Sequence, residues 1–285
     1  MNVTISDVFK ELKRRGEGAL VGYVTGGDPS PKHTPRVVEA LVKGGVDIVE
    51  IGVPFSDPIA DGPIIQSAVN RALHSGTTPQ TVFKIVRQTN RRVRTPLVLL
   101  TYYNILYRMG VKRFLKEAGE NGVDGIVVPD LPFEEASEYR ENAEKQGVDT
   151  IFLAAPSTPT SRLKNIISFT SGFLYLISVF GVTGVRRSVD QLTIRVIDKF
   201  KPYTDKTVPL AVGFGVSKPD HVRLIISHGA EAVIAGSVFV KTMERNLGDQ
   251  SRLMKELTAT AQTLKAATLS YSSNRRYAIE GNKFP

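Results

Sequence analysis

The run Leu97-Val98-Leu99-Leu100 decides the class of fold, because every position is apolar and no alternation with polar side chains occurs. A second run, Ile126-Val127-Val128, has the same property. A strand with one solvated face alternates, whereas parallel strands joined by crossover helices are covered on both faces. These runs therefore predict strands of a parallel sheet that is buried on both sides.

Short apolar runs rich in β-branched residues recur along the whole chain. Amphipathic stretches with apolar residues at helical spacing separate them, and glycine often stands where such a stretch ends. Eight units of this kind predict one α/β fold, a closed (β/α)8 TIM barrel, in preference to an open doubly wound sheet. The eight runs begin near Leu20, Ile48, Leu97, Gly125, Thr150, Phe173, Leu210 and Ala232, and the clearest helical stretches are 35–43, 78–91, 111–119, 134–146 and 219–227.

Two further helices are expected outside the eightfold repeat. Residues 6–15 predict an N-terminal helix over the barrel floor, and residues 250–267 predict a C-terminal helix. The polar and basic stretch 271–285 is expected to be loosely packed, or ordered only by a partner. No proline-rich linker or low-complexity tract divides the chain, so a single TIM-barrel domain is expected over 1–285. Its expected parts are 1–18 for the N-terminal helix, 19–246 for the barrel, and 247–285 for the C-terminal helix and tail.

The composition favours a soluble cytoplasmic protein. Cysteine is absent, which excludes disulfides and thiolate chemistry. The first 15 residues lack the apolar stretch of a signal peptide, and the apolar segment around 97–106 is far shorter than the roughly 20 residues that span a membrane. The net charge is +9, but the basic clusters are small, so a solvated basic surface is expected and a nucleic-acid site is not.

Glu50 is the first candidate for chemistry, since it is the one carboxylate within the apolar run Ile48-Val49-Glu50-Ile51. Strand alternation places it on the face opposite Val49 and Ile51. Burial of a lone carboxylate raises its pKa and suits it to donate and accept a proton near neutrality. The structural alternative at this point is a buried glutamate paired with a lysine or arginine at a strand end.

The loop after this strand, residues 52–63, presents Asp57 and Asp61 from a backbone restricted by three prolines and two glycines. Either aspartate could instead serve a turn or cap a helix. Together with Glu50 the two aspartates could also suggest a site for a hard cation. No histidine supports a metal site, because all four fall in helices or helix ends: His33, His74, His221 and His228.

Glycines at the ends of three consecutive strands predict a phosphate site. Gly184 follows the sixth run in Gly181-Val182-Thr183-Gly184, Gly215 follows the seventh in Gly213-Phe214-Gly215, and Gly236-Ser237 follows the eighth. In barrels of this kind, the loops after strands seven and eight bind phosphate through bare backbone N–H groups and a helix N-terminus. A single Gly-X-Gly would more often be a tight turn, but successive strand ends favour a ligand site.

The loop Glu50-Ile51-Gly52-Val53-Pro54-Phe55-Ser56-Asp57-Pro58-Ile59-Ala60-Asp61-Gly62-Pro63 closely resembles the signature loop of tryptophan synthase alpha chains. The resemblance covers essentially residues 20–241. It continues through Tyr23-Val24-Thr25, Gly27-Asp28-Pro29, Tyr102-Tyr103-Asn104, Asp124, Asp130-Leu131-Pro132, Ser178, Gly181-Val182-Thr183-Gly184, Gly213-Phe214-Gly215-Val216 and Gly236-Ser237.

The resemblance implies a lyase that cleaves indole-3-glycerol phosphate to indole and glyceraldehyde 3-phosphate in tryptophan biosynthesis. Glu50 would be the principal acid-base catalyst, and Asp61 would accept the hydrogen bond of the indole N–H. Thr183 would orient Asp61 as its loop closes. The apolar walls would be Tyr23, Ile65, Leu100, Val127, Phe214 and Ile234, with Tyr102 and Tyr175 near the polar centre; Gly184, Gly215, Gly236 and Ser237 would hold the phosphate.

The resemblance also implies a partner. The alpha chain needs no cofactor or metal of its own, and pyridoxal phosphate is expected in a separate beta chain within an alpha2beta2 heterotetramer. Pro54, Asp57 and Asn104 would then lie at the interface.

Two departures from the family pattern stand out, and neither touches the carboxylates. In Val127-Val128-Pro129 the first and third positions differ from the usual leucine and alanine, and Pro129 stiffens the expected pocket wall. Val179-Phe180 is more apolar than the polar pair typical of the family.

Rival interpretations fit the residues less well. A metal-dependent epimerase requires histidines at strand ends, and indole-glycerol phosphate synthase requires a pair of strand-end lysines; the sequence displays neither. A catalytically silent barrel, retained as a scaffold for the beta chain, would have no reason to keep both Glu50 and Asp61.

Overall fold

The computed structural model describes residues 3–59, 61–177, 186–213 and 215–270. Its strands form one sheet with the order β5-β4-β3-β2-β1-β9-β8-β7-β6, and neighbouring strands pair in parallel. The strands are β1 (Ala19–Thr25), β2 (Ile48–Gly52), β3 (Leu97–Leu100), β4 (Gly125–Val127), β5 (Asp149–Ile151), β6 (Leu153–Ala154), β7 (Leu174–Ile177), β8 (Leu210–Gly213) and β9 (Ala232–Ala235).

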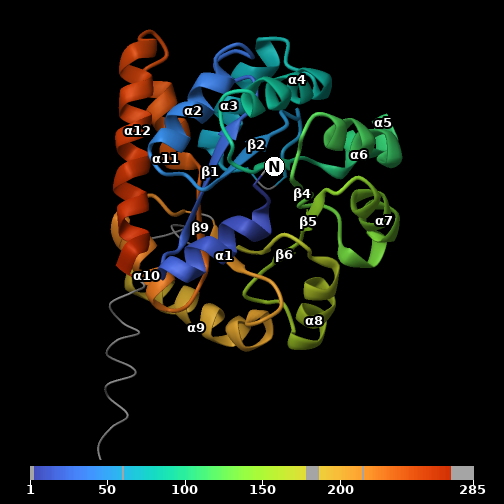
Figure 1. Cartoon of the computed structure of the whole chain (residues 1–285), viewed down its shortest axis with the longest axis vertical. Coiled ribbons are helices and arrows are strands. Elements are labelled where there is room, and N and C mark those ends of the chain that lie inside the picture. Colours follow the sequence, from blue (N-terminus) through green and yellow to red (C-terminus); the bar gives the residue numbers. More distant parts are fainter. Residues whose placement is uncertain (1–2, 60, 178–185, 214, 271–285) are drawn as a thin grey trace, which may run out of the picture.

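Helices surround this sheet on its outer side (Figure 1). All five helical stretches expected between strands are confirmed, with ends that shift by at most a few residues. The helices are α1 (Ile5–Arg15), α2 (Thr34–Lys43), α3 (Pro63–His74), α4 (Pro79–Asn90), α5 (Tyr103–Met109), α6 (Val111–Glu120), α7 (Ser137–Lys145), α8 (Thr160–Phe169), α9 (Arg186–Thr204), α10 (Pro219–Ser227), α11 (Ser237–Arg245) and α12 (Gln250–Ala267), with 3-10 turns η1 (Phe133–Glu135) and η2 (Thr268–Ser270).

The predicted (β/α)8 barrel is confirmed, but the fifth predicted strand is divided into β5 and β6. β5 pairs with β4, whereas β6 pairs with β7, so the two edges of the sheet meet at this strand and close the barrel. Phe152 lies between the two segments, buried against the rings of Tyr139 and Phe169. Its carbonyl accepts a hydrogen bond from the Tyr175 amide at 3.0 Å, so the chain passes from one neighbouring strand to the other at this residue.

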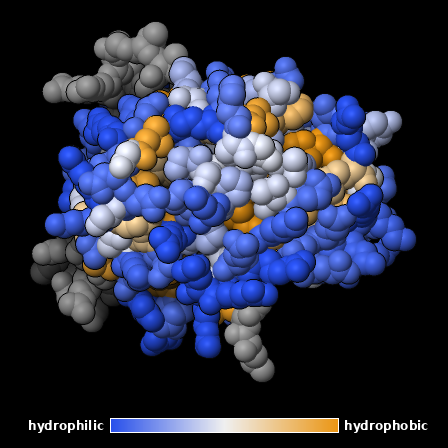
Figure 2. All heavy atoms as spheres, turned by 90° about the horizontal axis from the view of Figure 1, so that it is seen from above, coloured by the Kyte–Doolittle hydropathy of each residue, from blue (hydrophilic) through white to orange (hydrophobic). Residues whose placement is uncertain are grey.

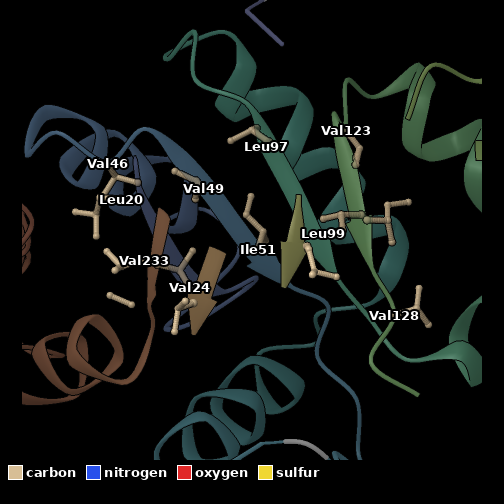
Figure 3. Close-up of a cluster of buried hydrophobic side chains, with 14 of the residues drawn as sticks. Leu20, Val24, Val46, Val49, Ile51, Leu97, Leu99, Val123, Val128 and Val233 are labelled. Atoms are coloured by element: carbon tan, nitrogen blue, oxygen red, sulfur yellow. The ribbon is translucent and has the colours of Figure 1, made fainter. Parts of the chain in front are cut away.

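Most of the buried apolar residues form two cores, one on each face of the sheet. Val49 and Ile51 point toward the helices and pack with Leu20 and Leu99 in the larger core (Figure 3). Ile48 points the other way, into the smaller core inside the barrel. Strand alternation therefore turns Glu50 toward the barrel interior, as the sequence predicts.

Helix α1 closes the barrel floor, as predicted. It crosses the ring of strands in Figure 1, and Ile5, Phe9 and Leu12 belong to the interior core. The helix begins at a capping box, in which the Thr4 side chain accepts from the Asp7 amide and the Asp7 carboxylate accepts from the Thr4 amide. It ends at Gly16, whose φ of 71° suits a residue without a Cβ.

Helix α12 confirms the predicted C-terminal helix and lies along α2 and α10 at one side of the barrel (Figure 1). Lys265 reaches from it to the barrel floor, where Nζ donates to the Asp47 carboxylate at 2.9 Å and to the Gly18 carbonyl at 3.1 Å. A Cβ on Gly44 would lie 2.4 Å from the Ala261 Cβ, so glycine permits this close packing. The stretch 271–285 lies outside the described residues.

The charged residues lie mainly at the surface. The face in Figure 2 is largely hydrophilic, with small separate hydrophobic patches. Arg14 and Arg15, which belong to a basic cluster in the sequence, both pair with Glu11 at 2.8 Å. None of the helices that the structure describes has the length and apolarity needed to cross a membrane.

Candidate active site

A pocket of about 220 Å³ opens at the carboxyl ends of the strands, where catalytic residues gather in barrels of this kind. Strands β1, β2, β3, β7 and β9 and the loops after β2, β8 and β9 all contribute to it. Its lining consists of Tyr23, Glu50, Asp61, Gly62, Pro63, Ile64, Ile65, Leu100, Tyr175, Gly215, Ile234, Gly236 and Ser237.

Most of the site residues proposed from the sequence meet in this one pocket. Both carboxylates line it, together with Tyr23, Ile65, Leu100, Tyr175, Gly215, Ile234, Gly236 and Ser237. Tyr102 stands directly behind the lining and contacts Asp61. Val127 belongs to the apolar core inside the barrel and is not among the residues that line the pocket. Thr183, Gly184 and Phe214, and with them Val179-Phe180, lie outside the described residues.

Glu50 is completely buried and lies on β2 between Tyr23 of β1 and Val98 of β3 in the strand register. In the part of the chain that the structure describes, neither of its carboxylate oxygens has a hydrogen-bond partner. Burial, and secondarily the nearby charge of Asp61, raises the pKa of Glu50 from 4.5 to about 8. The structural alternative, a buried ion pair with a strand-end lysine or arginine, is not found among the described residues.

Two tyrosines flank Glu50 inside the barrel, and two strand glycines make room for them. A Cβ on Gly52 would lie 2.3 Å from the Tyr23 Oη, and a Cβ on Gly213 would lie 2.6 Å from Tyr175 Cε1. Both rings are almost fully buried, and burial raises the pKa of each tyrosine well above its usual value. The two hydroxyls therefore stay protonated at neutral pH and can donate hydrogen bonds.

Asp61 is half-buried and receives a hydrogen bond at Oδ2 from the Tyr102 hydroxyl at 3.2 Å. Its backbone carbonyl accepts from Gln66 Nε2 at 2.8 Å, which ties the loop to the first turns of α3. Burial raises the pKa of Asp61, and the hydrogen bond from Tyr102 opposes this shift. The residue that caps α3 is Gly62, so Asp61 does not have the capping role that the sequence left open.

Asp57 differs from Asp61 in its exposure and in its hydrogen-bond partner. It is exposed, does not line the pocket, and accepts a hydrogen bond from the adjacent Ser56 hydroxyl at 2.6 Å. This contact within the loop fits the turn role that the sequence left open. No group of three or more potential ligands stands close enough to hold a metal ion among the described residues.

The other end of the pocket is formed by Gly215 and by Gly236 and Ser237 at the start of α11. Gly215 has a φ of 81°, a conformation that side chains disfavour. A Cβ on Gly236 would lie 3.1 Å from the Tyr23 Cβ. Backbone amides in the first turn of a helix lack partners within the helix and carry partial positive charge, so this end of the pocket suits an anion.

Sequence reasoning missed three pocket residues, Gly62, Pro63 and Ile64. All three follow Asp61 directly, and Pro63 begins α3. Proline at the first helical position was an available signal, since its fixed φ favours the start of a helix. A helix beginning there turns its first residues toward the pocket entrance.

The three residues proposed for a partner interface differ in exposure. Asp57 and Asn104 are exposed, whereas Pro54 is buried within this chain. Two large apolar side chains that sequence reasoning missed are strongly exposed, Ile59 at 83% and Tyr107 at 72%. Ile59 follows Asp57 in the loop after β2, and Tyr107 lies on α5 after Asn104.

The raised pKa of Glu50 predicts a pH-dependent loss of stability. Between pH 4.5 and about 8 the folded chain retains a proton on Glu50 that the unfolded chain has released. Raising the pH in this window therefore favours unfolding, by up to about 1.4 kcal/mol per pH unit from this group. Urea unfolding at several pH values should show this loss in the wild type but not in Glu50→Gln.

An exposed glutamate supplies the control for that measurement. Glu141→Gln on the surface of α7 should follow the wild-type pH dependence. If the free energy of unfolding of Glu50→Gln ran parallel to that of the wild type from pH 5 to 8, burial would not hold Glu50 protonated.

Comparisons with known proteins identify the family of this chain. A sequence profile described as tryptophan synthase alpha chain matches residues 9–269. The tryptophan synthase alpha chain of Methanoregula boonei is 45% identical over 254 residues, which are 89% of this chain and 95% of that protein. The crystal structure of tryptophan synthase subunit alpha from Legionella pneumophila superposes with a TM-score of 0.85 at 30% identity, covering 94% of this chain and 98% of that one. A chain from a structural study of mutual activation in the tryptophan synthase α2β2 complex of Pyrococcus furiosus has a TM-score of 0.79 at 41% identity, covering 88% and 98%. This chain therefore belongs to the tryptophan synthase alpha chain family.

Proposed function

We propose that Glu50 and Asp61 carry out the reaction of this family, the cleavage of indole-3-glycerol phosphate to indole and glyceraldehyde 3-phosphate. The chain is a lyase of tryptophan biosynthesis. The observation that carries the assignment of roles is the position of Glu50, buried without a described hydrogen-bond partner in the pocket that Asp61 and the start of α11 also line. A group of this kind is available for proton transfer to a substrate.

Glu50 acts first as an acid and then as a base. With a pKa of about 8 it is mostly protonated at neutral pH and donates its proton to C3 of the indole ring. The resulting carboxylate takes the proton from the hydroxyl on the carbon attached to C3. The carbon–carbon bond breaks, its electron pair returns to the ring, and the hydroxyl carbon becomes the aldehyde of glyceraldehyde 3-phosphate. Glu50 ends the cycle protonated, as it began.

Asp61 stabilises the cationic intermediate. Protonation at C3 places positive charge on the indole nitrogen, and an ionised Asp61 that accepts the N–H hydrogen bond opposes that charge. The Tyr102 hydroxyl orients the carboxylate, since it donates to Oδ2 at 3.2 Å. The protonated ring itself withdraws the electrons, so the step requires neither a Schiff-base lysine nor a metal.

The remaining pocket residues hold the two ends of the substrate. The amides of Gly215, Gly236 and Ser237 bind the phosphate, and Gly184 completes that site. For Thr183 we propose the role that the family resemblance implies, which is to orient Asp61 and to exclude water from the pocket. The aromatic ring of the substrate lies against Tyr23, Ile65, Leu100, Phe214 and Ile234, with Tyr175 beside Glu50.

The partner we propose is a tryptophan synthase beta chain in an alpha2beta2 assembly, which holds the pyridoxal phosphate, receives indole and shares the cytoplasm with this chain. The related Pyrococcus furiosus protein comes from such a complex, for which mutual activation is described. Asp57 and Ile59 in the loop after β2, and Asn104 and Tyr107 on α5, present exposed polar and apolar surface. Pro54, buried here, would support the shape of its loop at the interface.

Indole release tests this function directly. The isolated chain should form indole from indole-3-glycerol phosphate slowly, and a saturating beta chain should raise the rate, because closing the loops that carry Asp61 and Thr183 costs entropy that a partner can offset. A rate that stays unchanged at saturating beta chain would refute the coupling. If no indole formed with or without the beta chain, the chain would be a catalytically silent barrel that serves as a scaffold for the beta chain.

A further inference from the structure

A buried ion pair behind the pocket joins three elements that position the site. Arg71 of α3 donates from Nε to Asp28 Oδ1 at 2.8 Å and from Nη2 to Oδ2 at 2.9 Å. Asp28 follows β1 and is fully buried, and the Arg71 side chain is only 21% exposed. Because this contact is planar and made at two points, it fixes the orientation of the Arg71 guanidinium relative to the Asp28 carboxylate as well as the distance between them.

The third nitrogen of Arg71 extends the contact to α11. Nη1 donates to the Ser67 hydroxyl at 2.9 Å and lies 3.4 Å from Glu244 Oε1, while the Ser67 hydroxyl donates to the same oxygen at 3.2 Å. Ser67 belongs to α3, and Glu244 belongs to α11. The guanidinium therefore connects the loop after β1, α3 and α11 at a single point.

Both helices begin at the pocket and run back from it side by side. Pro63, Ile64 and Ile65 in the first turn of α3 line the pocket, and so does Ser237 at the start of α11. Ile64 and Arg71 are seven residues apart, as are Ser237 and Glu244, so each pair lies on one helix face about 10 Å apart. Between these ends, Ala68 of α3 and Val240 of α11 share a buried apolar cluster with Tyr23.

Each helix start carries a different part of the substrate site. Asp61, at the indole end, immediately precedes the capping residue of α3, and its carbonyl is bound by Gln66 of that helix. The start of α11 forms the phosphate end. The distance between the indole end and the phosphate end of the pocket therefore depends on how α3 sits against α11.

We infer that Arg71, bound to Asp28 and Glu244, is a positioning residue that sets the spacing between the indole and phosphate ends of the pocket. Arg71 does not line the pocket and acts through the helices that it joins. The inference rests on the proposed function, since it requires one substrate that occupies both ends. Its consequence is specific. Weakening the contacts of Arg71 with Asp28 and Glu244 should lower the affinity for a ligand that spans both ends of the pocket and leave the affinity for ligands at one end unchanged.

The test measures the binding of three ligands to the full chain: inorganic phosphate, indole, and a non-cleavable indole linked by an alkyl chain to phosphate. Arg71→Lys keeps the charge, but an ammonium cannot make the two-point contact with Asp28 and also reach α11. It should weaken the linked ligand, and lower kcat/KM, by about tenfold, because small misplacements of reacting parts have large effects. The two single-ended ligands should change by less than about twofold.

Two other variants make the test independent of folding defects. Glu244→Gln leaves the buried Asp28–Arg71 pair in place and removes only the charge on α11, which is half exposed. It should weaken the linked ligand a few-fold, and it decides the matter if Arg71→Lys does not fold. Arg113→Lys changes an exposed arginine that pairs with Glu117 on α6, and it should leave all three ligands unaffected.

The outcomes separate the inference from the function on which it rests. If the wild type bound the linked ligand no more tightly than phosphate, the proposed function would fail. If the wild type bound it tightly and folded Arg71→Lys and Glu244→Gln did so equally, the positioning role would be wrong. Equal losses for all three ligands would likewise overturn it, since they would indicate general damage to the pocket.

Discussion

Replacing Glu50 by glutamine is expected to lower the rate of indole formation by about 10²- to 10⁴-fold, the range associated with general acid-base catalysis. The amide keeps the shape of the side chain but can neither donate the proton to C3 nor remove the proton from the hydroxyl. Because Glu50 is buried at the pocket wall and bears no described ion pair, substrate binding should be largely retained. Steady-state kinetics should therefore show a loss in kcat with little change in KM.

The pH profile checks the assigned role of Glu50. The value of kcat/KM reflects the protonation state of the free protein, and Glu50 must carry its proton for the reaction to start. The kcat/KM of the wild type should therefore decline as pH rises through about 8. Residual activity of Glu50→Gln should lack this decline. A folded Glu50→Gln barrel with near-normal turnover would show that Glu50 is a structural carboxylate, and the mechanism would have to be abandoned.

Replacing Asp61 by asparagine is expected to cause the second large loss, again in turnover more than in affinity. Asparagine can still accept the indole N–H hydrogen bond, but it lacks the negative charge that opposes the cationic ring. Loss of one group that stabilises developing charge typically lowers kcat by about 10²- to 10³-fold. Measurement of kcat and KM for indole-3-glycerol phosphate would show whether the loss is larger in turnover than in affinity.

Asp61→Asn has a second consequence that Glu50→Gln cannot have. The Asp61 charge contributes to the raised pKa of Glu50, although less than burial does. Removing it should move the alkaline limb of the profile modestly to lower pH while leaving the limb present. A Tyr102→Phe variant, which keeps both carboxylates and removes only the 3.2 Å hydrogen bond to Asp61, serves as a milder comparison. An unchanged kcat in Asp61→Asn would contradict the electrostatic role.

Much of the site was predictable from local pattern. Strand alternation around Val49 and Ile51 turns Glu50 inward, and an isolated carboxylate in an apolar strand predicts a raised pKa. The glycines after the last two strands lie at the pocket, because the carboxyl ends of parallel strands share one edge of a sheet. These inferences needed only spacing and residue type.

Other features were not predictable in this way. Val127 was expected in the pocket wall, but its side chain packs in the apolar core inside the barrel and is not among the residues that line the pocket. Pro129 likewise is not among the residues that line the pocket. Pro54 is buried by its own chain, a packing that its sequence does not indicate, and its place at a partner interface stays a prediction. The depth of a strand within the barrel and the packing of a loop depend on neighbours that lie far away in the sequence.

By itself the sequence determined the parallel strands, the helical stretches between them and the inward side of Glu50, because these follow from short-range periodicity and residue chemistry, whereas only the family resemblance singled out Asp61 from Asp57. Only the tertiary structure decided how the barrel closes at Phe152 and how Arg71 joins Asp28 to Glu244. Those contacts link residues 43 and 173 positions apart along the chain. No local sequence pattern predicts contacts between residues so far apart in the chain, because Arg71 meets Asp28 and Glu244 only after the sheet has curved and brought α3 against α11.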